Sequence, residues 1–116
     1  MTDERTTLID HGQLPTRNLA ECLAVDQRTL VSALAGQLPD TLIEQLATCA
    51  EETCSQGLSK KITGIGLALG QWLEPAPAPQ RQQVMEQCSA HSSDTVRSWA
   101  AFALAHLSRT LDLVAA

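Results

Sequence analysis

The chain has 116 residues, 44% of them hydrophobic and only 3% aromatic, and its formal net charge is −5 at pH 7. This length suffices for one domain with a single core, and the acidic balance disfavours general nucleic-acid binding, which needs clustered Lys and Arg. The longest apolar run, near residues 65–69, is far shorter than the roughly 20 residues of a membrane span. Because the amino-terminal residues also lack the apolar core of a signal peptide, we expect a cytoplasmic protein.

Apolar residues recur at helical spacing along the whole chain, and no alternating run is long enough to be a strand. The fold class is therefore predicted to be all-α, with about six to seven short antiparallel helices. After a first short helix that ends at residue 10, the expected helices cover about 15–25, 27–38, 41–54, 60–73, 80–91 and 94–109. Three alternating prolines between residues 74 and 79 predict an extended connector.

Local signals add detail to these helices. Thr41 and Glu44 have the spacing of a capping box, and the helix over 15–25 is expected to turn Leu19, Cys22 and Leu23 inward. Two glycines inside the helix over 60–73 each cost about 1 kcal/mol relative to alanine. They lie one turn apart, at positions 66 and 70, which predicts a close approach of another helix.

The chain also contains an internal repeat. Residues 65–70 match residues 100–105 at an offset of 35, and residues 35–38 match residues 69–72 at an offset of 34. We place each segment on the second helix of a helix–turn–helix unit. A period of about 35 with two helices per unit is typical of an α-solenoid, in which each unit buries its apolar face against its neighbours.

One unit carries a more specific signature. Asp94, followed by Val96-Arg97 and then by the alanine-rich stretch 100–105, resembles the second helix of a HEAT repeat. The resemblance covers one unit of three, because Lys60-Lys61 replace the Val-Arg signature in the middle unit. It implies a single domain over 1–116 built of three stacked helix pairs. These units would span about 15–38, 40–73 and 79–109, with the connector at 74–79.

The sequence predicts neither a metal site nor a catalytic site. Cys88 and His91 share a helical face, but they supply only two of the three or four ligands that zinc requires. We therefore expect the four cysteines, at positions 22, 49, 54 and 88, to be free thiols buried in the core. No motif sets a nucleophile beside a base, and no glycine-rich phosphate loop follows a strand. We expect a non-catalytic protein without a cofactor.

The candidate binding residues lie on the second helices of successive units. Cations near the starts of these helices form a predicted basic ladder, which the resemblance places on a concave face, and further candidates follow on the last helix. The set is Arg28, Lys60, Lys61, Arg97, Phe102, His106 and Arg109. It predicts a small interaction module, such as an adaptor, inhibitor or regulator, that binds an acidic segment of another protein. A row of solvated charges is the alternative interpretation.

Two further interpretations remain. The apolar residues 111–116 at the end of the last helix predict self-association or docking, so the chain could form a homo-oligomer through its C-terminal helix. Some DNA alkylation-repair glycosylases are also built of HEAT-like repeats, which makes nucleic-acid binding the runner-up function. It is disfavoured because those proteins are about twice as long and have a basic groove.

Overall fold

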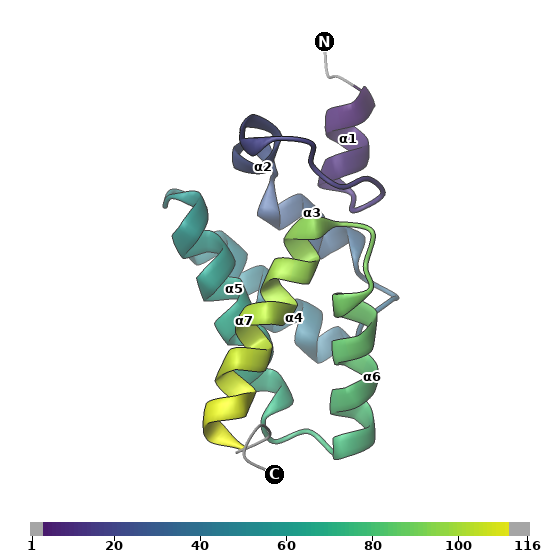
Figure 1. Ribbon diagram of the computed structural model, residues 1–116, viewed down its shortest axis with the longest axis vertical. Coiled ribbons are helices and arrows are strands. Elements are labelled where there is room, and N and C mark those ends of the chain that lie inside the picture. Colours follow the sequence, from purple (N-terminus) through teal and green to yellow (C-terminus); the bar gives the residue numbers. More distant parts are fainter. Residues whose placement is uncertain (1–3, 112–116) are drawn as a thin grey trace.

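The computed structural model describes residues 4–111, which form seven helices and no strand, and so confirms the all-α prediction (Figure 1). The helices are α1 Glu4–Asp10, α2 Leu19–Ala24, α3 Gln27–Ala33, α4 Asp40–Glu52, α5 Leu58–Leu73, α6 Ala78–Ser89 and α7 Asp94–Thr110. Together they measure 50 × 27 × 24 Å along the principal axes. No helix within residues 4–111 is long and apolar enough to cross a membrane.

The longest helices, α5 and α7, run side by side in the same direction (Figure 1). Each follows an antiparallel partner, α4 before α5 and α6 before α7. Along the seam, Gly66 faces Phe102 and Gly70 faces His106, so the contacts advance together on both helices. The repeated segments 65–70 and 100–105 are therefore neighbouring parallel stretches.

The α5–α7 seam confirms the predicted close approach at the two glycines. A Cβ atom on Gly66 would lie 2.6 Å from the Cβ of Phe102 and 3.0 Å from the carbonyl oxygen of Trp99. A Cβ on Gly70 would lie 3.0 Å from the imidazole of His106. Only residues without a side chain allow α7 to sit this near, which explains why two costly glycines stand inside α5.

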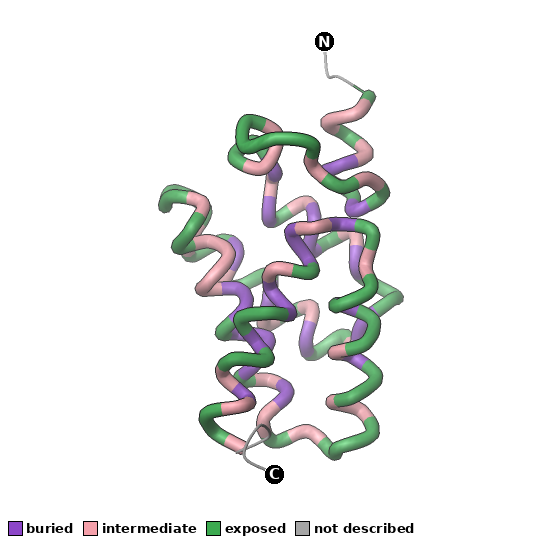
Figure 2. Tube along the Cα trace, viewed as in Figure 1, coloured by how far each residue is buried: buried purple, intermediate pink, exposed green. Residues whose placement is uncertain are grey.

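The core runs along the middle of the molecule and is built almost entirely of aliphatic side chains (Figure 2). One fully buried aromatic ring, that of Trp99, lies within it. The predicted inward stripe of the third helix, Leu30, Val31, Leu34 and Leu38, is buried as expected. Helix α3 is therefore anchored although it is only seven residues long.

Helix α2 departs from the prediction. It begins at Leu19, four residues later than expected, because the Asn18 side chain accepts a hydrogen bond from the backbone N–H of Glu21 and caps it there. The expected inward residues are wrong for Leu19 and Leu23, whose side chains are 68% and 56% exposed. Helix α2 buries none of its residues fully and lies on the rim of the molecule.

Two further boundaries differ from the prediction. Helix α3 ends at Ala33, and Gly36 turns the chain with a φ of +88°, so residues 35–38 form a turn. Their sequence match, residues 69–72, lies inside α5, so the offset-34 match does not reflect a shared structure. Helix α6 begins at Ala78, which shortens the irregular connector by two residues.

The predicted capping box at the start of α4 is also wrong. Helix α4 begins directly after Pro39 and has no side-chain cap. The hydroxyl of Thr41 instead accepts a hydrogen bond from Nε1 of Trp72 at 3.2 Å. This bond ties the first turn of α4 to the last turn of α5.

Candidate partner-binding surface

A hollow of about 210 Å³ opens between the α2–α3 junction, the end of α4 and the start of α5. Its wall combines the exposed Leu23 with the cations Arg28 and Lys61, and Asp26, Gln27 and Cys54 also line it. Elements that are far apart in the sequence thus place two predicted binding residues, Arg28 and Lys61, at one site. We call this region the α2–α5 hollow.

Arg28 extends from the first turn of α3 and is exposed. Its guanidinium lies 3.6 Å from the carboxylate of Asp26 and 3.5 Å from that of Glu51. The negative charges of these two residues, first Asp26 and then Glu51, raise the pKa of Arg28 above its ordinary value. The positive charge of Arg28 is therefore permanent but partly compensated.

Lys60 and Lys61 are placed differently, because both stand in the first two turns of α5. The backbone amides at a helix start carry partial positive charge, so cations there are electrostatically unfavourable. Within the described residues, no carboxylate lies within ion-pair distance of either lysine, and no side chain caps the start of α5 after Gly57. The start of α5 thus carries two lysines without an ion pair in the described structure, and Lys61 places this positive charge at the hollow.

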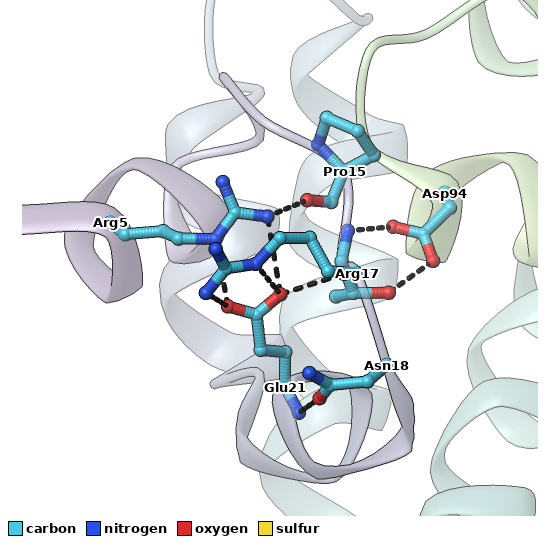
Figure 3. Close-up of polar contacts among 7 residues, drawn as sticks. Arg5, Pro15, Arg17, Asn18, Glu21 and Asp94 are labelled. Carbon is cyan, nitrogen blue, oxygen red and sulfur yellow. Dashed lines mark hydrogen bonds and ion pairs between the residues drawn. The ribbon is translucent and has the colours of Figure 1, made fainter.

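Arg97 does not reach this hollow. Its Nη1 donates to the carbonyl oxygen of His91 at 2.6 Å and lies 3.4 Å from that of Ser92, so it holds the turn between α6 and α7. The neighbouring Asp94 accepts hydrogen bonds from the backbone N–H and the hydroxyl of Thr16 at 2.8 and 2.6 Å (Figure 3). Burial raises the pKa of Asp94, but the bonds from Thr16 and the charge of Arg97 outweigh it, so the net pKa is lowered.

The remaining candidates form a separate group farther along α7. Phe102 rests on Gly66 of α5 and is partly exposed. The imidazole Nε2 of His106 lies 3.0 Å from Glu74 Oε2, which connects α7 to the end of α5. Arg109 is exposed in the last turn. The predicted ladder therefore divides into a cationic group at the α2–α5 hollow and a group on α7.

A polar cluster around Glu21 of α2 was not predicted from the sequence. The carboxylate of Glu21 accepts bonds from Arg5 at 2.8 Å and from Arg17 at 2.9 Å, and Arg5 also donates to the carbonyl oxygen of Pro15 (Figure 3). The hydrogen bonds from Arg5 and then Arg17 lower the pKa of Glu21 to about 2. With the Asp94–Thr16 bonds, the cluster positions α2, which supplies the apolar rim of the hollow.

The Glu21 cluster predicts a specific loss of stability in acid. The pKa of Glu21 is about 2 in the folded chain and about 4.3 in an unfolded chain, so its stabilisation is complete above pH 5 and is lost as the pH falls towards 2. We expect Glu21→Gln to lower the thermal midpoint at pH 7 and to flatten its dependence on pH between about 5 and 2. Glu44→Gln is the control, because Glu44 is exposed and its carboxylate has no hydrogen bond or ion pair within residues 4–111. Parallel pH profiles for wild type and Glu21→Gln would contradict the assignment.

Gln27 is a second residue that the sequence analysis missed. Its side chain is buried, and its Oε1 accepts a hydrogen bond from Nε1 of Trp99 at 3.1 Å. The Nε2 of the same amide has no hydrogen-bond partner in the described structure. A glutamine next to an N-cap Asp26 gives no local signal of burial, because the bond spans 72 positions of sequence.

The cysteines were predicted to be buried, and Cys54 contradicts this because it is exposed at the hollow. Cys88 is buried, and desolvation raises the pKa of its thiol to about 11. Cys22 and Cys49 are only half-buried, which also departs from the prediction, and burial raises the pKa of both. Among the residues that the structure describes, no three His, Cys, Asp or Glu side chains gather in a way that could hold a metal ion.

The turn between α6 and α7 brings a histidine next to two serines, but its geometry is structural. Ser92 donates its hydroxyl proton to the carbonyl oxygen of Gly12, and the hydroxyl of Ser93 caps α7 by accepting from the backbone of Val96. The imidazole Nδ1 of His91 accepts the backbone N–H of Ser93 at 2.9 Å, and burial together with the charge of Arg97 lowers the pKa of His91. These contacts join the turn to the loop after α1.

Comparison with known proteins adds no assignment: no protein-family model matches the chain, and no curated protein or solved structure matches it.

Proposed function

We propose that the chain is a non-catalytic interaction module that binds an acidic segment of another protein at the α2–α5 hollow. The observation that carries the proposal is the pair of lysines, Lys60 and Lys61, at the uncapped start of α5 with no carboxylate to compensate them within residues 4–111. A partner carboxylate placed there would meet two ammonium groups and the free amides of the helix start together.

Apolar contacts supply the other half of the proposed recognition. Leu19 and Leu23 lie one turn apart on α2 and are among the most exposed large hydrophobic side chains of the described chain. Leu23 and Lys61 line the same hollow, so one bound segment can contact both. An acidic segment with spaced apolar side chains therefore fits the surface better than a uniformly charged one, because apolar anchors contribute affinity while charges contribute orientation and association rate.

The test uses a short fluorescein-labelled peptide that is rich in glutamate and has leucines one helical turn apart. We expect Lys60→Glu and Lys61→Glu each to weaken its binding at least about tenfold in a fluorescence anisotropy titration. Neither variant should lose stability, because a glutamate in the first turns of α5 interacts favourably with the helix dipole. Loss of binding without loss of stability would separate recognition from folding.

Two controls make this test decisive. Arg109→Glu changes the net charge by the same amount at the far end of α7 and should bind the peptide as wild type does. A peptide with glutamines in place of the glutamates should bind only weakly. If Arg109→Glu weakens binding as much as Lys61→Glu, or if a labelled DNA duplex binds more tightly than the acidic peptide, the proposal is wrong. The second result would favour nucleic-acid binding.

A further inference from the structure

The outer face of α7 repeats a helix-binding face that is already occupied within the chain. On α5, Gly66, Leu69 and Gly70 are buried, and α7 passes directly over the two glycines. Their counterparts 35 positions later are the three residues Ala101, Leu104 and Ala105. These three are exposed, Leu104 by 49%. Helix α7 thus carries the same pattern of small residues around a leucine, but no helix of residues 4–111 covers it.

The complementary ridge is also repeated. Phe102 and His106 of α7 rest on the two glycines of α5, and their counterparts on α5 are Leu67 and Gln71. Both counterparts are exposed, Leu67 by 42%. They border a groove of about 470 Å³ between α4 and α5. The described chain therefore exposes a ridge on one side and a matching face on the other.

We propose that a second copy of this chain packs the ridge of its α5 over the outer face of α7, in the same parallel geometry by which α7 packs over α5. Leu67 and Gln71 of one copy would lie over Ala101 and Ala105 of the next, with Leu104 directed into the groove between α4 and α5. Because the two faces are different, the contact is head-to-tail and continues from copy to copy. It continues a packing interface that the chain itself contains.

The charges beside the groove and on α7 are opposite. Helix α4, which forms one wall of the groove, carries four carboxylates and no base; Glu52 lines the groove itself, whereas Glu51 is paired with Arg28. Helix α7 carries two arginines, at positions 97 and 109, and no acidic residue after its first position. Opposite charges across the contact favour this orientation over pairing of two α7 helices, which would bring arginines together.

The contact is tested by sedimentation equilibrium at about 0.15 M salt and at protein concentrations up to about 1 mM. A dissociation constant weaker than about 1 mM would mean that association supplies less than about 4 kcal/mol. We expect the average mass of the wild type to rise above 12.5 kDa with concentration. Leu104→Glu and Leu67→Glu should each remain monomeric, since each loses one face by burying an unpaired charge. An equimolar mixture of the two should form a dimer and nothing larger, because one intact face of each kind remains.

Matched controls keep the result interpretable. Gln83→Glu adds the same charge at an exposed position of α6 and should associate as wild type does. Far-UV circular dichroism checks the helix content, and Ala105→Glu is a second block of the α7 face if Leu104→Glu does not fold. A wild type that is monomeric throughout, a mixture that stays monomeric, or a Leu67→Glu variant that still dimerises would each overturn the proposal. The last result would indicate symmetric pairing of α7 helices. Binding of the acidic peptide should be unchanged in these variants, which separates this proposal from the preceding one.

Discussion

Replacing Gly66 by alanine is expected to destabilise the fold by about 2 kcal/mol, although alanine is the better helix former. The new Cβ would lie 2.6 Å from the Cβ of Phe102 and 3.0 Å from the carbonyl oxygen of Trp99. Neither atom is the end of a flexible side chain, so relief requires α5 and α7 to move apart along the most extensive contact in the molecule. The midpoint of urea unfolding should fall while the slope stays constant.

Gly64 on the same helix provides the control with the opposite sign. A Cβ there would lie 3.4 Å from Thr53 and 3.5 Å from Cys49, which are ordinary van der Waals distances. Gly64→Ala should therefore stabilise the protein by about 0.5–1 kcal/mol, the ordinary gain from removing an interior helix glycine. If Gly66→Ala stabilises the protein as Gly64→Ala does, α5 and α7 are farther apart than the structure places them.

The helices could be predicted because their signals are local. Apolar residues at helical spacing mark α4 to α7, and two costly glycines one turn apart predict that another helix approaches α5 closely there. The ends of the short helices could not be predicted in the same way. Helix α3 ends early because Gly36 turns the chain, and α2 starts late because Asn18 caps it. Several neighbouring residues could have capped the start of α2 or ended α3 equally well.

The candidate site was harder to derive for a physical reason. The sequence places a cation near the start of each expected second helix, but it does not show what each cation contacts. Arg97 is engaged by two backbone carbonyls, Arg28 by two carboxylates, and the two lysines by no carboxylate in the described structure. That difference depends on tertiary neighbours, and it is the reason why the proposed binding site is centred on Lys60 and Lys61.

In the proposed binding site, the position of the two lysines would set partner binding against the local stability of α5. Cations in the first turns of a helix oppose its dipole, and α5 has neither an acidic residue there nor a side-chain cap. Local stability would favour glutamate at both positions. In the proposed binding site, an anionic partner would supply the negative charge that the start of α5 lacks. Lys61→Glu is therefore expected to gain stability as well as to lose peptide binding.

Trp99→Phe is expected to cost about 2–3 kcal/mol, because it breaks the hydrogen bond that connects α7 to α3 and also leaves a cavity. In this variant, the Gln27 carbonyl loses the one donor that it has within residues 4–111 and is left buried without a partner, and the smaller ring leaves a cavity. Trp72→Phe is the matched control. It loses a similar bond, to Thr41, at a partly exposed site, so water replaces the donor and the cost should be below about 1 kcal/mol.

Replacing Gln27, the acceptor of the same bond, separates the cost of an unpaired polar group from the cost of lost packing. Gln27→Leu removes the bond but also removes the Nε2 group that has no partner in the described structure, so its cost should be about 1 kcal/mol. The double variant of Trp99→Phe and Gln27→Leu leaves no buried polar group unpaired at this point. It should therefore be at least about 1 kcal/mol more stable than the sum of the single effects predicts. Urea unfolding followed by far-UV circular dichroism measures all three variants, and effects that add within about 0.5 kcal/mol would show that the two side chains are not coupled.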